Sequence, residues 1–357
     1  MKIPVVDFGA YKLGENDVSG EQLEILSRQL KTAFTEVGFV YLKNTGIVQQ
    51  EVDGVMNISK KFFLQPDEMK LPFSRKSFAN NPNHGWVSSE TESLNPKRPG
   101  DLKEAFNTAS LHPVIKWPSW EGVSGFCEIQ SSFFLRCKDL SLRVLHVMAY
   151  SLGLEAEVFL SVHRHIGSDE NGSTLRSLYY PPVRGDRVKE GQLRCGEHSD
   201  YGSITLVFQN QEGGLQNQEG GLQVNKTPLN PLVFQNQEGG LQVNKTPLNP
   251  LVFQNQEGGL QVRTRSGEFI SAPSIPGTVL INIADLMQRW TSDVFLSAVH
   301  RVLLPPAGDL STRQSLAFFV QPDDEALITC CDGSNKYPPV KAGAYLIERF
   351  NDSYGRK

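Results

Sequence analysis

The stretch HSDYGSITLVF, residues 198–208, places a histidine and an aspartate directly before an apolar segment. The segment Ser203–Phe208 has the short length and β-branched content typical of a strand. Residues two positions apart on an extended chain project from the same face. His198 and Asp200 would therefore offer an imidazole and a carboxylate on one side of the chain. Such a pair arises easily by chance and usually lies on a solvated loop, so it indicates a metal site only with a third ligand.

Similar short apolar segments, separated by glycine and proline turns, continue along the second half of the chain. This texture is typical of an antiparallel sandwich or barrel, here of the jelly-roll kind. The expected strands are 175–180, 203–208, 259–262, 278–283, 296–304 and 315–320.

The first half of the chain has the periodicity of helices. Ser19 and Gln22 can form a capping box before an apolar repeat that runs up to Gly38. A longer amphipathic pattern predicts a helix over 122–152. The sequence therefore predicts a mostly β protein with helical support (α+β), in which a double-stranded β-helix (jelly-roll) core packs on N-terminal and long central helices. Other expected elements are strands at 4–8 and 39–42, a helix over 50–64 and an irregular stretch over 80–120.

His300 is the strongest candidate for the third ligand. It lies in the alternating segment Ala298–Val302, where its side chain shares a face with two apolar neighbours and so points inward. The alternative is a core histidine bonded to a backbone carbonyl. His163 and His165 form a rival His-x-His pattern, but they fall near a helix-to-loop junction and are interpreted as structural or solvated.

Arg313 and Ser315 open the next predicted strand on a common face. A guanidinium that enters an apolar barrel needs an anionic partner, because an unpaired buried charge is very costly. A substrate carboxylate would satisfy both side chains, with the arginine giving fork-like hydrogen bonds. The alternative is a surface salt bridge at the start of the strand. Two histidines with one carboxylate form the facial triad of non-haem Fe(II) oxygenases, and this triad favours the inward anion site.

With these residues, the chain resembles the isopenicillin N synthase-like family of Fe(II)/2-oxoglutarate-dependent dioxygenases. His198-x-Asp200, His300 and Arg313-x-Ser315 match the family's motifs in order and context, and the resemblance covers nearly the whole length outside a duplicated segment. Further matching stretches are IPVVDF (3–8), GFVYLKNTGI (38–47), FFLQP (62–66), DLKEAF (101–106) and LRSLYYPP (175–182).

The resemblance implies a role for each matching residue. His198, Asp200 and His300 would bind Fe(II), and no catalytic residue is expected beyond this metal centre. Arg313 and Ser315 would bind the distal carboxylate of 2-oxoglutarate.

A tyrosine before the double proline supplies a further implied contact. Tyr180 matches a tyrosine that often bonds the co-substrate, and packing as a sheet aromatic is the equal alternative. Leu178 stands where many plant members carry an asparagine, so a second bond of that kind is not expected.

The resemblance also implies the reaction. The enzyme would use Fe(II), 2-oxoglutarate and O2, with ascorbate as a candidate reductant, to oxidise a small organic substrate, chiefly by hydroxylation, with release of succinate and CO2. Two alternatives stay open: a 2-oxoglutarate-independent non-haem iron oxidase of the same family, and a non-catalytic binding protein. We expect substrate selection to come from loops over the barrel mouth and from the C-terminal segment 345–354.

The composition argues against several other classes of protein. Thirty-five Lys and Arg residues stand against 39 Asp and Glu residues, a formal net charge of −4, so there is no basic footprint for nucleic acid or an anionic membrane. No apolar stretch is long enough for a signal peptide at the N-terminus or for a membrane span. Five cysteines without a Cys-x-x-Cys spacing are interpreted as reduced thiols. We expect a cytoplasmic monomer whose partner is a small molecule.

The chain length of 357 residues includes a duplicated segment. The heptapeptide NQEGGLQ occurs four times, starting at Asn210, Asn217, Asn236 and Asn255. The copies are identical and carry few large apolar residues, which favours a recent duplication or a gene-model error over a solenoid or binding array. We expect three regions: an N-terminal α/β region over 1–120, supporting helices over 121–165, and a jelly-roll domain over 166–357, interrupted at about 210–254. Of the four copies, the last is expected to enter the sheet, because it continues into the next strand.

Deleting residues 210–254 leaves one copy in frame and a chain of 312 residues. We predict that the shortened protein folds and still binds Fe(II), because long structureless insertions go to surfaces. Calorimetric titration of the anaerobic protein with Fe(II) measures this. Loss of folding on deletion would mean that the repeats are structural.

Overall fold

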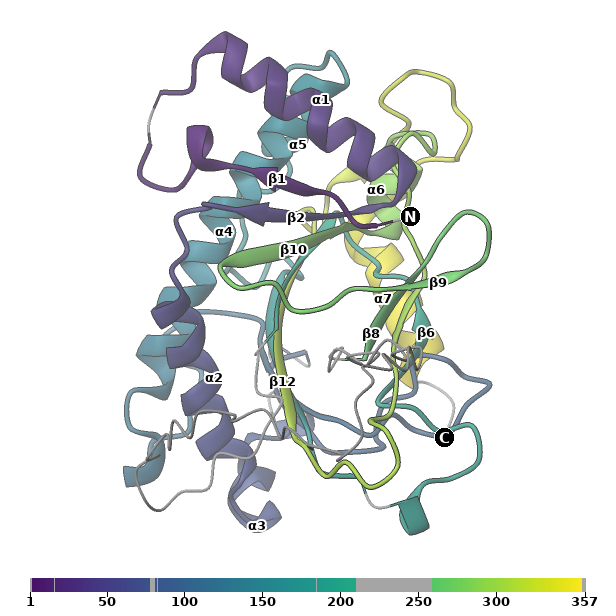
Figure 1. Cartoon of the computed structure of the whole chain (residues 1–357). Coiled ribbons are helices and arrows are strands. Elements are labelled where there is room, and N and C mark those ends of the chain that lie inside the picture. The colour runs from purple at the N-terminus through teal and green to yellow at the C-terminus, as the bar shows by residue number, and fades with distance from the viewer. Residues whose placement is uncertain are drawn as a thin grey trace, which may run out of the picture. The chain divides into compact units, whose positions relative to one another are not determined.

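An eight-stranded sheet forms the main body of the fold (Figure 1). The computed structural model describes residues 2–15, 17–77, 81, 83–183, 185–209 and 259–354. The strands of this sheet, in spatial order, are β1 (Val5–Asp7), β2 (Phe39–Lys43), β10 (Thr278–Ile283), β7 (Ile204–Gln209), β12 (Arg313–Val320), β5 (Thr174–Tyr180), β4 (Glu104–Thr108) and β3 (Gly85–Val87).

A second, four-stranded sheet faces the interior from the other side (Figure 1). Its order is β6 (Cys195–His198), β11 (His300–Val302), β8 (Leu260–Arg263) and β9 (Phe269–Ser271), and every pair is antiparallel. A short hairpin of β13 (Leu327–Ile328) and β14 (Val340–Lys341) stands apart. The two facing sheets confirm the predicted jelly-roll fold with helical support.

Three long helices cover the outer face of the large sheet (Figure 1). Phe133 and Phe134 of the longest one pack edge-on against Phe208 and Phe318 of the sheet, with ring centroids 5.1 and 4.9 Å apart. These helices are α1 (Gly20–Glu36), α2 (Gln49–Phe63) and α4 (Phe126–Ser151), and the shorter ones are α3 (Asp67–Lys70), α5 (Glu157–Leu160), α6 (Asp285–Trp290) and α7 (Ala342–Tyr354). Among the described residues, no helix is long and apolar enough to cross a membrane.

Because side chains alternate along each strand, one face of the large sheet carries the apolar core and the other faces the polar space between the two sheets. In β12, Leu316, Phe318 and Val320 face the helices and belong to the main hydrophobic core. Arg313 and Ser315 occupy the opposite parity and face the space between the sheets. The predicted inward orientation of these two residues is therefore confirmed.

Several boundaries differ from the predictions for physical reasons. The capping box at Ser19 is present, but the long helix begins at Phe126 rather than at 122, because Gly125 has a left-handed backbone (φ 80°) that ends the preceding turn. The stretch 80–120 is not wholly irregular, since it contains β3 and β4, which extend the sheet from β5. The strand expected over 296–304 is limited to His300–Val302.

The duplicated segment 210–254 lies outside the described residues, apart from its flanks. Strand β7 ends at Gln209, and β8 begins at Leu260 within the last copy of the heptapeptide. Leu260 and Gln261 pair with Val302 and Arg301 of β11, as expected for the last copy. The region boundaries near 120 and 165 stay predictions, although strands from the first and last of these regions share one sheet.

Gly38, between α1 and β2, is the glycine that the fold tolerates least well when changed. Its φ is +76°, and a Cβ there would lie 2.2 Å from the backbone oxygen of Leu296. We predict that Gly38→Ala lowers the free energy of unfolding by roughly 2 kcal/mol or more. Gly54, in the middle of α2 with open space around it, is the matched control, and Gly54→Ala should raise stability by about 0.5–1 kcal/mol. Urea unfolding of both variants checks this; equal effects would contradict it.

Candidate metal centre

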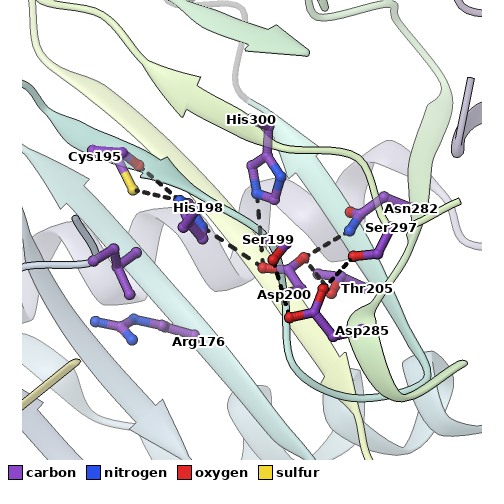
Figure 2. A network of polar contacts seen from close by, with 12 residues as sticks. Arg176, Cys195, His198, Ser199, Asp200, Thr205, Asn282, Asp285, Ser297 and His300 are labelled. Atoms are coloured by element: carbon purple, nitrogen blue, oxygen red, sulfur yellow. Dashed lines mark hydrogen bonds and ion pairs between the residues drawn. The ribbon is translucent and has the colours of Figure 1, made fainter. Parts of the chain in front are cut away.

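The pairing of β6 with β11 brings the two predicted histidine ligands together. His198 and His300 are register partners across this pair, and their ring centroids are 4.3 Å apart. Asp200 follows two residues after His198, and its Oδ1 lies 3.7 Å from Nε2 of each histidine (Figure 2). One ligand atom from each of the three residues lies within 4.8 Å of the others. The structure thus brings together the three residues predicted from the sequence, and their role as metal ligands stays a prediction.

Hydrogen bonds orient both imidazoles toward a common point. Nδ1 of His198 bonds the carbonyl of Gly196 at 2.8 Å, and Nδ1 of His300 bonds that of Ala298 at 3.2 Å. When Nδ1 carries the proton, Nε2 keeps a free lone pair. This lone pair lies on the side of Asp200, where it can bind a metal ion. Burial lowers the pKa of His300 to about 4, which keeps its ring neutral. Neutral imidazole is the form that binds a metal ion.

Asp200 is fixed in the same way. Its Oδ2 accepts hydrogen bonds from Thr205 Oγ1 and Asn282 Nδ2, both at 2.7 Å, so Oδ1 remains for the centre (Figure 2). Burial alone would raise the pKa of Asp200, but attraction to His300 and His198 together with these bonds lowers it. The donor set is two imidazole nitrogens and one carboxylate oxygen on one side, which fits a divalent iron ion with further positions open.

A cavity of about 580 Å³ extends from this cluster to the second predicted group. Arg313 is buried at its far end, where the guanidinium donates to Ser315 Oγ at 3.3 Å and to Gln209 Oε1 at 2.9 Å. Within the described residues, no carboxylate forms an ion pair with Arg313. The cavity therefore offers a buried cation and a hydroxyl that an anionic ligand can satisfy.

Tyr180 lies directly opposite Arg313 in the register of β5 and β12. Its buried ring has the guanidinium of Arg313 4.7 Å from its centroid and that of Arg194 5.8 Å away. The ring therefore lies beside two cations. It also belongs to a hydrophobic core cluster, as the sheet-aromatic alternative expects, and lines the cavity. Leu178 lines the same wall without a polar group. A bond from Tyr180 to the co-substrate stays a prediction.

Some residues of the site were missed at the level of sequence. Thr205 and Asn282 hold the aspartate, Gln209 holds Arg313, and Arg194 adds a second buried cation. The first two could have been found as polar residues at inward positions of apolar strands. Arg194 directly precedes β6, a strand that the pattern of apolar residues does not predict.

The rival histidine pair is not part of the centre. His163 is buried, with Nδ1 bonded to Phe159 O at 2.7 Å and Nε2 to Ser203 Oγ at 2.9 Å. His165 is exposed and pairs with Asp323 at 3.3 Å. Both agree with the structural and solvated roles predicted for them.

A second cavity of about 560 Å³ lies on the other side of the cluster and shares His198 and Asp200 with the first. We call it the outer chamber. Leu346 and Phe350 of α7 line it, which agrees with the expectation that the C-terminal segment takes part in substrate selection. Its remaining lining residues are Asn83, Glu92, Leu94, Asn107, Gly172, Thr174, Arg176, Ser199, Tyr201, Phe319 and Gln321.

Comparison with known proteins gives matches along nearly the whole chain. Residues 3–125 match the family model for the non-haem dioxygenase in morphine synthesis N-terminal region. Residues 171–245 and 246–322 match the 2OG-Fe(II) oxygenase superfamily. A UPF0676 protein of Schizosaccharomyces pombe is 30% identical, with 99% of this chain and 94% of that protein covered. The 2-oxoglutarate-dependent dioxygenase htyE of Aspergillus rugulosus is 27% identical, with 92% and 90% covered.

Solved structures give the same result. A full-length Neurospora crassa protein in complex with alpha-KG (2-oxoglutarate) and thymine superposes with a TM-score of 0.72 at 28% identity, with 98% of this chain and 96% of that chain covered. A putative 2OG-Fe(II) oxygenase family protein from Caulobacter crescentus, at 22% identity and a TM-score of 0.69, shares the fold, with 98% of each chain covered.

Replacing any one of the three clustered residues by alanine should weaken metal binding by at least about 100-fold, because each supplies one of the three protein ligands. Co(II), which resists oxidation, is a suitable ion for calorimetric titration. His165→Ala is the matched control and should leave the affinity unchanged. Thr205→Val should weaken binding by about 10-fold through loss of the bond that orients Asp200. Full affinity in Asp200→Ala would contradict the assignment.

Proposed function

The chain belongs to the 2OG-Fe(II) oxygenase superfamily, and we propose that His198, Asp200 and His300 hold its iron while Arg313 and Ser315 hold the distal carboxylate of 2-oxoglutarate. The protein is an Fe(II)- and 2-oxoglutarate-dependent dioxygenase that oxidises a small organic substrate with release of succinate and CO2. The observation that carries the residue assignment is one cavity with a metal-binding triad at one end and a buried arginine without a carboxylate partner, among the described residues, at the other.

Each group of the chain has a defined task in this reaction. Iron, when bound, supplies the activation of dioxygen. The bonds to Gly196 O and Ala298 O fix the two imidazole rings, and Thr205 and Asn282 fix the carboxylate of Asp200. These bonds fix the positions of the donor atoms, which limits the reorganisation needed on binding.

Arg313 selects the co-substrate. A dicarboxylic 2-oxo acid can reach the triad with its keto-acid end and place its other carboxylate against the guanidinium and the hydroxyl of Ser315. Apolar side chains on the walls, among them Phe39, Val302 and Leu260, exclude water around the reacting groups. Phe39 also packs edge-on against the His300 ring, with centroids 5.6 Å apart.

The outer chamber is the place for the organic substrate in this proposal, because it reaches the triad from the side away from Arg313. Its space of about 560 Å³ includes a part that is open to solvent, so the substrate in this proposal is a compact molecule. The similarity to the Neurospora crassa protein, whose structure contains thymine, supports a substrate of that size. Succinate release should therefore be screened first with nucleobases, then with amino acids, flavonoid-like phenolics and peptides.

Two properties of the whole protein belong to the same proposal. All five cysteines are unpaired, which supports a reducing compartment such as the cytoplasm. We also propose a monomer that binds neither nucleic acid nor membrane. Gel filtration of the purified chain tests the monomer.

The two alternatives make different predictions for the same assay. A 2-oxoglutarate-independent oxidase would consume oxygen with substrate at an unchanged rate when 2-oxoglutarate is omitted. A binding protein would retain a ligand without releasing succinate. The complete donor set favours the enzyme, since a protein that only binds a small organic ligand does not need two imidazoles and a carboxylate oriented toward one point.

Arg313→Gln should raise the Kd of 2-oxoglutarate for the Co(II)-loaded protein by about 10- to 100-fold, because a charge-assisted pair of hydrogen bonds is lost. Its Kd for Co(II) should stay unchanged, since Arg313 lies at the far end of the cavity. Arg265→Gln, at an exposed arginine, is the control and should alter neither constant. A normal Kd for 2-oxoglutarate in Arg313→Gln would refute the role of this residue.

A further inference from the structure

The outer chamber has a buried ion pair on its wall. Arg176 of β5 donates to both carboxylate oxygens of Glu92, at 3.1 and 2.7 Å. Arg176 is 9% exposed and Glu92 4% exposed, and both line the chamber. A pair this deep is weakly screened, so the balance of its charges strongly affects which ligand can lie beside it.

Two further buried charges lie beside this pair. Lys103 Nζ lies 3.1 Å from Glu92 and 2.7 Å from Asp101. Burial opposes the charge on Lys103, but attraction to the carboxylates, chiefly that of Asp101, keeps its pKa well above the ordinary value. Among the described residues, these four side chains are two cations and two carboxylates, whose formal charges cancel. The guanidinium on the chamber wall is already neutralised by the protein itself.

The two cavities differ in the partners of their arginines. Arg176 and Lys103 also line the cavity of Arg313, but Glu92 lines only the outer chamber. In the cavity of Arg313, the described residues supply a buried guanidinium bonded only to neutral groups, which an anionic ligand would neutralise. In the outer chamber, an anion would have to compete with Glu92 for Arg176, and a cation would have to compete with Arg176 for Glu92. Either charged ligand leaves one buried charge uncompensated, which is costly.

The chamber instead offers neutral hydrogen-bonding groups. Asn107 Nδ2 donates to Asn83 Oδ1 at 3.1 Å, and Asn83 Nδ2 donates to Thr174 Oγ1 at 2.8 Å. Oδ1 of Asn107 is buried and accepts no hydrogen bond from the described residues. Because buried polar atoms are nearly always bonded, this oxygen is suited to accept an N–H or O–H from a ligand.

We propose that the part of the substrate that enters the outer chamber is uncharged and carries a hydrogen-bond donor, such as an amide, lactam or hydroxyl group, and that the Glu92–Arg176 pair enforces this choice. The inference rests on the proposed function only in that the outer chamber receives the substrate. It excludes free carboxylates and amines at this position.

Three isosteric probes test the proposal: benzamide is neutral, benzoate is an anion and benzamidine is a cation. Binding is measured by ligand-observed NMR on the full chain loaded with Zn(II) and saturating 2-oxoglutarate, so that the Arg313 cavity is filled and no turnover occurs. The unaltered protein should prefer benzamide to both charged probes by at least 10-fold. Glu92→Gln should shift the preference to benzoate, and Arg176→Gln should shift it to benzamidine.

Glu104→Gln is the matched control. Glu104 of β4 pairs with buried Lys70 at 2.7 Å and does not line the chamber, so its loss should leave the preference for benzamide unchanged. The probe preferences of Glu92→Gln and Arg176→Gln shift in opposite directions only if the ion pair sets the charge of the chamber wall. A purely structural role would not produce opposite shifts. If one variant fails to fold, the preference of the other decides. Equal binding of all three probes to the unaltered protein, binding of none, or an unchanged preference in a folded variant overturns the proposal. Succinate release is not involved, so failure here is distinct from failure of the dioxygenase assignment.

Discussion

The antiparallel pairing of β6 with β11 is the interaction on which the metal centre depends. It places His198 opposite His300, although the two residues are far apart in the chain. The outer face of the same two strands carries a polar cross-link, in which Glu197 pairs with Arg301 at 3.1 Å and with Arg98 at 2.7 Å. A slip of one residue in either strand would turn the histidine of that strand outward and bring its charged neighbour, Glu197 or Arg301, into the cavity. The inward metal ligands and the outer ion pairs therefore require the same register of β6 and β11.

The same two-residue period organises the large sheet. Apolar residues on one face pack on α2 and α4, while the other face presents polar and charged groups to a closed interior. Burying Arg313 there costs free energy that apolar packing on the opposite face offsets. The fold can hold such a site because the strands that carry it are anchored by their other face.

Much of this organisation could be predicted from the sequence, because strand periodicity is a local property. Alternation along the strands, together with the family motifs, identified five candidate site residues: His198, Asp200, His300, Arg313 and Ser315. Strands β3 and β4 were missed because the pairing of β4 with β5, and of the edge strand β3 with β4, is a tertiary effect within a segment rich in turn residues. The Glu92–Arg176 pair was missed for a similar reason, since it joins a loop residue to a strand residue 84 positions away.

The position of the duplicated segment follows from the topology. It lies between β7, which is held on both sides by β10 and β12, and β8, which is held on both sides by β11 and β9. Neither strand takes its register from the other, so the length of the connection does not set the pairing of either one. Lengthening a flexible connection from about 5 to about 50 residues costs roughly 2 kcal/mol of closure entropy, because that cost grows only with the logarithm of length. A connection between two strands that are each fixed by their own neighbours is therefore a place where a chain can gain 45 residues while the geometry of the metal-binding triad is kept.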